Sequence, residues 1–263
     1  MVFRPDKMEV ARSFKRCLTT YDENALIQKK VSERLIRLLS ESADREFKRV
    51  LEVGCCTGML SEMFCSQFSV GTLYVNDLVP ELCEKAKERV LRDLQTVEIF
   101  PGDIEELDIP GRLDLILSSS TMQWLSDFPG ILQRFSKALV DGGYIAISLF
   151  GDGTFREIKE LTGRGLHYLP FEEICSIVDN HFDILRTEIS EDRLFFPNSR
   201  DVLRHLQATG VSGLGFYRWT SATLRSFENE YRRLYGSEEG VGLSYVSHFL
   251  VARKKIQEDD DGR

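Results

Sequence analysis

Residues 49–58 read Arg49-Val50-Leu51-Glu52-Val53-Gly54-Cys55-Cys56-Thr57-Gly58, an apolar run that ends in a glycine turn. The apolar run predicts a buried strand, and the residues after Gly58 predict a helix. Glycine lets the backbone pass close to a ligand, and the start of a helix offers N–H groups without intrahelical partners. A strand, a glycine turn and a helix in this order predict a nucleotide-binding pocket.

A carboxylate follows the next apolar run of the chain. Asp77 comes directly after Leu73-Tyr74-Val75-Asn76, where it can accept hydrogen bonds from a ribose. The turn lacks the third glycine of the dinucleotide fingerprint, and Glu52 just before it suits a cationic amino-acid ligand better than a pyrophosphate. The pattern therefore predicts S-adenosylmethionine (SAM) as the cofactor.

Short apolar runs alternate with amphipathic stretches through residue 150, which predicts an α/β fold with a parallel sheet covered by helices. We expect strands near 48–53, 72–77, 96–100, 113–118 and 143–149. The expected helices are Met59 to Phe68, Pro80 to Leu94 and Phe128 to Val140, with a turn at Asp141-Gly142-Gly143. Gly102-Asp103-Ile104-Glu105 and Ser118 to Trp124 follow the third and fourth strands. Because strand ends converge in such sheets, these loops should meet at one crevice.

The rest of the chain predicts a cap, a lid and two further strands. Residues 1–45 form helices interrupted near Tyr21, which would place that side chain above the glycine turn. We expect a core at 46–152, a lid with one core strand at 153–236, a terminal core strand at 237–256 and a disordered tail at 257–263. Within these, the patterns predict helices at 154–161, 171–179, 199–209 and 221–234, and strands at 182–189 and 243–252.

Composition narrows the class of protein. A formal net charge of −8 argues against a general nucleic-acid binder, although a local basic face keeps nucleic acid as a minor alternative. No run approaches the roughly 20 apolar residues of a membrane helix, so we expect a cytoplasmic protein without a membrane partner. Six cysteines without paired C-x-x-C spacing and four scattered histidines predict reduced thiols and no metal site. We expect a monomer.

Several short motifs in one order resemble a known family. They are Tyr21-Asp22 with Ala25 and Gln28, Leu51-Glu52-Val53-Gly54-Cys55, Gly102-Asp103-Ile104-Glu105, Gln123-Trp124 and Gly142-Gly143. The chain resembles the class I SAM-dependent methyltransferases, and more narrowly the malonyl-[acyl-carrier protein] O-methyltransferases of biotin synthesis. Leu206 to Val211 and Leu243-Ser244-Tyr245 extend the resemblance to the second half. Cys56 departs from the family's glycine, and Gln207 stands at a place often held by lysine.

The resemblance implies a Rossmann-like fold, with a mostly parallel seven-stranded sheet, helices on both faces and a helical lid. It implies methylation of the free carboxylate of a malonyl thioester on acyl-carrier protein, with malonyl-CoA left open as a substrate. An ionised carboxylate is itself the nucleophile, so no general base is required. With the residue patterns, it gives a cofactor-binding set of Gln28, Glu52, Gly54, Cys55, Gly58, Asp77, Leu78, Asp103, Ile104 and Ser119.

The substrate would contact Gln123, Trp124 and Tyr21, and the Tyr21 hydroxyl would act in catalysis. An arginine partner for the carboxylate is expected, but the sequence does not identify it. Arg12, Lys15 and Arg16 share one helix face that could dock the acidic carrier, and Arg200 with Arg204 forms a second basic pair. Two alternatives stay open: a carboxyl methyltransferase for a small free acid, and a SAM-binding accessory protein without transfer activity.

Overall fold

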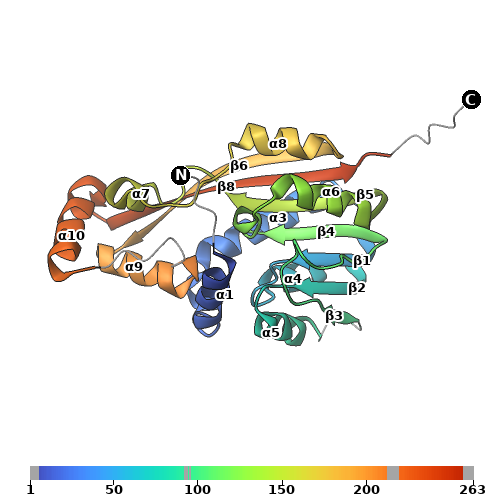
Figure 1. The fold of residues 1–263 in the computed structure, drawn as a ribbon, viewed down its shortest axis with the longest axis horizontal. Coiled ribbons are helices and arrows are strands. Elements are labelled where there is room, and N and C mark those ends of the chain that lie inside the picture. Colours follow the sequence, from blue (N-terminus) through green and yellow to red (C-terminus); the bar gives the residue numbers. More distant parts are fainter. Residues whose placement is uncertain (1–5, 92–93, 95, 212–218, 257–263) are drawn as a thin grey trace, which may run out of the picture.

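An eight-stranded sheet forms the centre of the molecule in a computed structural model, which describes residues 6–91, 94, 96–211 and 219–256 (Figure 1). Seven strands follow one path in the order β3-β2-β1-β4-β5-β8-β6. The parallel part comprises β1 (Glu46–Val53), β2 (Ser69–Asn76), β3 (Val97–Ile99), β4 (Leu113–Ser119) and β5 (Leu139–Phe150). The antiparallel part comprises β8 (Gly240–Lys254), β6 (Phe182–Phe196) and the short β7 (Gly236–Ser237). The predicted fold class is confirmed, with β7 added to the seven expected strands.

Helices cover both faces of this sheet. One face packs α3 (Leu26–Ser40), α4 (Met59–Cys65) and α5 (Pro80–Val90), and the other packs α6 (Phe128–Ala138) and α8 (Phe171–Asp179). Neighbouring strand residues divide between the faces: Val50 joins the first core and Leu51 the second. Because both faces are covered, the strands read as continuous apolar runs rather than alternating ones.

The path of the sheet reverses at β1. The chain runs outward from β1 through β2 to β3, and then returns to place β4 on the other side of β1. Ligands of open α/β sheets bind beyond the carboxyl ends of the strands at this kind of position. The glycine turn follows β1 and therefore lies where a ligand is expected.

Two long strands extend beyond the rest of the sheet. β6 and β8 pair from Phe182↔Lys254 to Phe196↔Val241, whereas β5 pairs with β8 only as far as Phe150↔Ser247. The remaining two-stranded ribbon carries α7 (Arg156–Thr162), α9 (Ser199–Ala208) and α10 (Ser221–Tyr235), at the left of Figure 1. Helix α8 packs on β6 and α6. The ribbon thus presents three helices beyond the main sheet, whereas α8 belongs to the sheet's covering layer.

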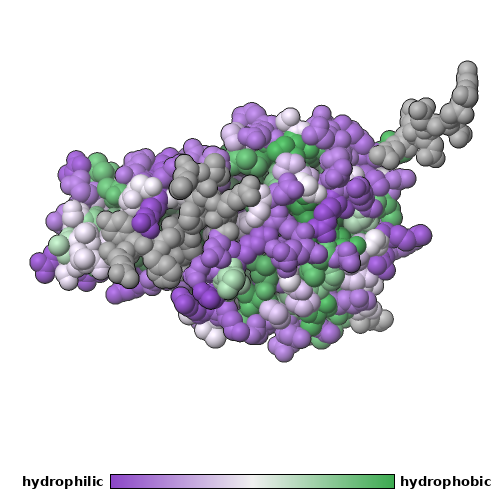
Figure 2. Space-filling view, in the orientation of Figure 1, coloured by the Kyte–Doolittle hydropathy of each residue, from purple (hydrophilic) through white to green (hydrophobic). Residues whose placement is uncertain are grey.

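The N-terminal cap consists of α1 (Lys7–Arg16), α2 (Tyr21–Asn24) and the start of α3. The helix break predicted near Tyr21 is confirmed, since Cys17 to Thr20 separate α1 from α2. The Thr20 hydroxyl donates to the Ala208 carbonyl at 3.3 Å, which joins the cap to α9. The side of the molecule shown in Figure 2 is mainly hydrophilic, with hydrophobic residues scattered over the sheet region.

Two sequence predictions need correction. The strand expected at 182–189 runs to Phe196, because Glu191 to Arg193 lie on the solvated ribbon, where charged side chains are tolerated. The turn expected at Asp141-Gly142-Gly143 lies inside β5, where the pairing skips from Leu113↔Leu139 to Leu115↔Tyr144. Gly142 has φ +73° in this irregular segment. The expected tail, 257–263, and 212–215 of the glycine-rich stretch lie outside the described residues.

Candidate functional site

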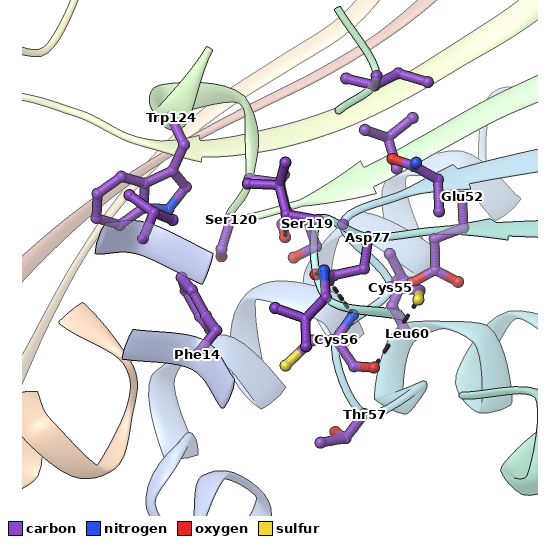
Figure 3. A pocket seen from close by; sticks show the side chains of 18 of the residues that line it. Phe14, Glu52, Cys55, Cys56, Thr57, Leu60, Asp77, Ser119, Ser120 and Trp124 are labelled. Atoms are coloured by element: carbon purple, nitrogen blue, oxygen red, sulfur yellow. Dashed lines mark hydrogen bonds between the residues drawn. The ribbon is translucent and has the colours of Figure 1, made fainter. Parts of the chain in front are cut away.

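A cleft of about 930 Å³, including its open mouth, lies at the carboxyl ends of β1, β2 and β4. Its walls come from the glycine turn, the loops after β2, β3 and β4, and the cap. In the close view, Glu52 lies at one end, Phe14 and Trp124 lie at the other, and Asp77 lies between them (Figure 3). The cleft therefore offers carboxylates along one part of its length and an aromatic wall at its end.

The glycine turn has an unusual backbone that its neighbours enforce. Gly54, Cys56 and Gly58 all have positive φ, at +74°, +46° and +81°. A Cβ on Gly54 would lie 2.7 Å from the Cβ of Thr121, and one on Gly58 would lie 2.7 Å from the Cα of Ala86. Cys56, which departs from the family's glycine, takes a left-handed conformation that costs an L-residue roughly 1–2 kcal/mol. The turn is thus fixed by packing as well as by its glycines.

Asp77 connects the turn to the end of β2. Its carboxylate accepts hydrogen bonds from the backbone N–H groups of Cys56 and Val79, both at 3.0 Å. Burial raises the pKa of the Asp77 carboxyl to about 6, against the lowering effect of these hydrogen bonds. Each oxygen can accept a further bond, so this carboxylate is suited to two neighbouring hydroxyl groups of a ligand.

Glu52 is buried at the end of β1, with 1% of its surface exposed. The Ser61 hydroxyl donates to Oε2, whereas Oε1 has no partner among the described residues. Burial raises the pKa of Glu52 to about 8. Gln28 Oε1 is also buried without a partner and lines the same cleft. Two unpaired acceptors fit a ligand that brings N–H donors and positive charge, as the methionine end of SAM does.

Lys7 reaches across the cleft from the first turn of α1. Its ammonium pairs with the carboxylates of Asp103 and Glu105 in the loop after β3. These contacts raise the pKa of Lys7, although burial has the largest single effect and acts in the opposite direction. Phe14, further along α1, packs its ring edge-on against Trp124 at 6.2 Å. The cap is therefore joined to two of the loops that line the cleft.

The structure brings most of the predicted cofactor-binding residues together. The cleft is lined by Gln28, Glu52, Gly54, Cys55, Asp77, Leu78, Asp103, Ile104 and Ser119. Gly58 is not among the lining residues, because its open side faces Ala86 of α5. The sequence interpretation missed Lys7, Phe14 and Thr121, which reach the cleft only through tertiary packing. A lysine at the start of an amphipathic helix carries no sequence pattern that distinguishes it from a solvated one.

A second pocket of about 330 Å³ adjoins the first. Its apolar wall is formed by Phe14, Trp124, Phe150, Phe155, Leu166 and Val211. Its polar groups come from Tyr21, Gln28, Ser120, Gln123, Tyr168 and Thr209. None of these described lining residues is charged. Five residues line both pockets, so the two spaces meet at these side chains: Phe14, Tyr21, Gln28, Ser120 and Trp124.

Tyr21 is placed at this junction by the helix break. It is the first residue of α2 and is 9% exposed, and its ring lies 6.3 Å from that of Phe14. Burial raises the pKa of the Tyr21 hydroxyl well above its ordinary value, so the hydroxyl stays protonated at neutral pH. Gln123 lines the second pocket alone, and Trp124 lines both.

The histidines line neither of these pockets. His205 packs under the ribbon with its Nε2 2.6 Å from the Tyr245 hydroxyl, and His248 is buried beside the Phe171 ring. The described ranges contain no group of three or more His, Cys, Asp or Glu side chains that could hold a metal ion. In the same ranges, no helix has the length and hydrophobicity needed to cross a bilayer.

Comparisons with known proteins agree with this geometry. Residues 51–147 match the family described as "Methyltransferase domain". The chain is 37% identical over 254 residues to a malonyl-[acyl-carrier protein] O-methyltransferase of Chlorobium phaeovibrioides, covering 95% of this chain and 97% of that one. A protein of the same name from Acinetobacter baylyi is 33% identical, with 95% and 97% covered.

Solved structures share the fold at much lower identity. The N-methyltransferase NodS of Bradyrhizobium japonicum, in complex with S-adenosyl-L-homocysteine, gives a TM-score of 0.57 at 14% identity, covering 94% of this chain and 98% of that one. The [4+2]-cyclase SpnF gives 0.54 at 17% identity, covering 85% and 81%. Because proteins of different activity share this architecture, the structural likeness shows the fold alone.

The match to the methyltransferase family, on a sheet that reverses at β1 and carries a cleft beside a glycine turn, identifies the chain as a class I methyltransferase that uses SAM. The two relatives named above are more than 30% identical to this chain over 95% of its length, which identifies the family within this class. The chain belongs to the malonyl-[acyl-carrier protein] O-methyltransferase family.

The raised pKa of Asp77 predicts a pH dependence of SAM binding. Above pH 6 the carboxylate is ionised and can accept two hydroxyl hydrogen bonds, whereas below it a proton must leave before SAM binds in this way. The dissociation constant should therefore rise by up to about tenfold per pH unit below pH 6, whereas a change near pH 8 would belong to Glu52, whose pKa is raised to about 8. Calorimetry between pH 5 and 8 measures it, and the Asp77→Asn variant should lack this acidic limb. An equal rise in that variant would assign the effect to another group.

Proposed function

We propose that this protein transfers the methyl group of SAM to the free carboxylate of malonyl-[acyl-carrier protein]. The observation that carries the proposal is the junction of the two pockets at Tyr21, Gln28 and Ser120. One pocket has the carboxylates and glycine turn that suit SAM, and the adjoining one has the apolar walls and neutral donors that suit a short acyl group. The names of its relatives support this substrate.

For this reaction, the main task of the protein is to position the two reactants. When bound, SAM supplies a methyl group activated by a sulfonium, whose sulfur keeps the bonding electron pair as the ester forms. A carboxylate with an ordinary pKa near 4 is already ionised and needs no general base. The side chains at the junction hold the carboxylate in line and exclude water, and such positioning accounts for a large part of many enzymatic rates.

Each cofactor contact in this proposal has a structural basis. Asp77 would accept the ribose hydroxyls, while Asp103 and Ile104 would lie around the adenine. Gln28 and Glu52, with their unpaired buried oxygens, would hold the methionine end. Gly54, Cys55, Leu78 and Ser119 would shape the cleft around the cofactor. Tyr21, Gln123 and Trp124 would contact the acyl group.

The carrier would have to dock near the second pocket. The candidate basic face on α1 is partly neutralised, because Arg12 pairs with Glu9 and Lys15 with Glu81. Arg200 and Arg204 pair with Glu228 and Asp201. Both surfaces remain candidates for the docking of the carrier. Methylation of the malonyl group on the carrier would place the protein at the start of biotin synthesis, as the resemblance to the malonyl-[acyl-carrier protein] O-methyltransferases implies.

Transfer of a labelled methyl group tests the function directly. Full-length protein would be incubated with labelled SAM and, separately, malonyl-carrier, malonyl-CoA or free malonate. We expect base-labile methyl ester on the carrier-bound substrate. A higher kcat/KM on free malonate would favour the small-acid alternative. Tight SAM binding without transfer to any acid would favour an accessory protein.

The junction predicts a specific effect of removing one hydroxyl. Tyr21→Phe should lower kcat for malonyl-carrier at least tenfold, because it removes a hydrogen bond to a charged group, worth roughly 1.5–3 kcal/mol. SAM affinity should change less than twofold, since the ring and its packing remain. Single-turnover kinetics and calorimetry separate the two effects. Equal losses in binding and rate would argue against a substrate role for the hydroxyl.

A further inference from the structure

Tyr168 contributes a hydroxyl group to the second pocket, and this hydroxyl has no hydrogen-bonding partner in the described part of the chain. The residue lies between α7 and α8, lines the second pocket and is 8% exposed. Its oxygen is not fully enclosed by protein, so it can bond to water when the pocket holds no ligand. A phenylalanine would only extend the apolar wall of Phe150, Phe155 and Leu166, whereas this hydroxyl gives the wall a donor that a bound ligand can use.

The donors of the second pocket limit which groups can bind a carboxylate. The Thr209 hydroxyl already donates to the His205 carbonyl at 2.9 Å. The Gln123 amide donates to the Ser120 carbonyl at 2.7 Å and leaves its own Oε1 as an unpaired acceptor. The Ser120 hydroxyl is buried without a partner among the described residues and is a further available donor at the junction of the pockets. Tyr21, whose hydroxyl also contacts the Cys56 thiol, and Tyr168 come from different segments of the chain and line the same pocket. Burial raises the pKa of both phenols, so both remain protonated donors.

We propose that Tyr168 is a substrate-binding residue, and that its hydroxyl and that of Tyr21 hold the acyl carboxylate between them in the second pocket. This inference rests on the proposed function and extends it, because nothing in the sequence assigns a role to Tyr168. Two phenols orient a carboxylate by hydrogen bonds and leave it more nucleophilic than a bidentate arginine pair would. Because both donors are neutral, the sulfonium of the cofactor would be the positive charge nearest to the bound carboxylate.

Two probes that differ by one carboxylate test this role. We would measure the dissociation constants of malonyl-carrier and acetyl-carrier for the full-length protein, with S-adenosylhomocysteine bound. Tyr168→Phe should weaken malonyl-carrier at least tenfold and change acetyl-carrier less than twofold. In the methyl-transfer assay, KM for malonyl-carrier should rise, and SAM affinity should stay unchanged.

A matched variant controls for loss of a tyrosine hydroxyl elsewhere. Tyr235 lies on α10, and its hydroxyl contacts Glu160 outside both pockets. Tyr235→Phe should change neither carrier's affinity. Thermal unfolding of Tyr168→Phe checks that the variant remains folded.

Three outcomes would overturn or separate the proposals. Equal weakening of malonyl-carrier and acetyl-carrier would mean that Tyr168 shapes the pocket without binding the carboxylate. Unchanged affinity for malonyl-carrier would remove Tyr168 from the site. Failure of the unmutated protein to methylate any malonyl thioester would reject the proposed function itself, independently of the Tyr168 variant.

Discussion

Replacing Asp77 by alanine should weaken SAM binding at least tenfold. The carboxylate lies in the middle of the cleft and is the one predicted to hold the ribose, through charge-assisted hydrogen bonds worth roughly 1.5–3 kcal/mol each. It also accepts from the Cys56 and Val79 N–H groups, so its loss leaves one donor of the glycine turn and one at the start of α5 without their partner. Calorimetry on the folded variant measures the change.

Asp114 provides a matched control for this experiment. Its carboxylate accepts from the backbone N–H groups of Lys48 and Arg49, both at 2.7 Å, near the start of β1 and away from the cleft. Asp114→Ala removes the same kind of interaction and should leave SAM affinity within twofold. If both variants lost affinity equally, the effect would be a general weakening of β1, and Asp77 would have no direct role.

Replacing Gly58 by alanine should lower the free energy of unfolding by about 3 kcal/mol. The added Cβ would lie 2.7 Å from the Ala86 Cα, and neither backbone can move without displacing α4 or α5. The positive φ of +81° adds its own cost. Thermal or denaturant unfolding without cofactor measures the loss.

Gly163 separates these two causes. It has φ +66°, but an added Cβ would meet no heavy atom within 4 Å. Gly163→Ala should therefore cost only the conformational part, roughly 1–2 kcal/mol. Equal losses in the two variants would show that the contact with Ala86 does not matter and that backbone conformation alone explains the glycine at 58.

The sequence predicted the elements of the sheet where burial makes the pattern simple. The segments 48–53 and 113–118 each contain adjacent apolar residues, Val50-Leu51 and Leu115 to Leu117, because both faces of those strands are covered, and the structure confirms them as β1 and β4. The second half of β6 was missed because it lies on a ribbon beyond the main sheet and begins with three consecutive charged residues, Glu191 to Arg193. The spacing of apolar residues in a sequence indicates which residues are buried, so it does not identify a strand segment that lies partly in solvent.

The lining of the cleft was predictable for residues that directly follow a strand. Asp77 and Asp103 were found because they follow strands whose ends converge at one edge. Tyr168 was not found, because a lone tyrosine between two helices has no distinguishing pattern. Thr121 and Lys7 were missed for a related reason, since their contacts with Gly54 and Asp103 join segments far apart in the sequence.

The two pockets draw on different parts of the chain. Residues that line the first all fall between Lys7 and Leu125, whereas the second adds walls from Phe150 to Val211. Under the proposed function, the binding sites of the methyl donor and the methyl acceptor are therefore encoded in separable regions that meet at a few shared side chains. In evolutionary terms, such a chain could change its acceptor by diversifying the helices on its ribbon while keeping the donor site unchanged.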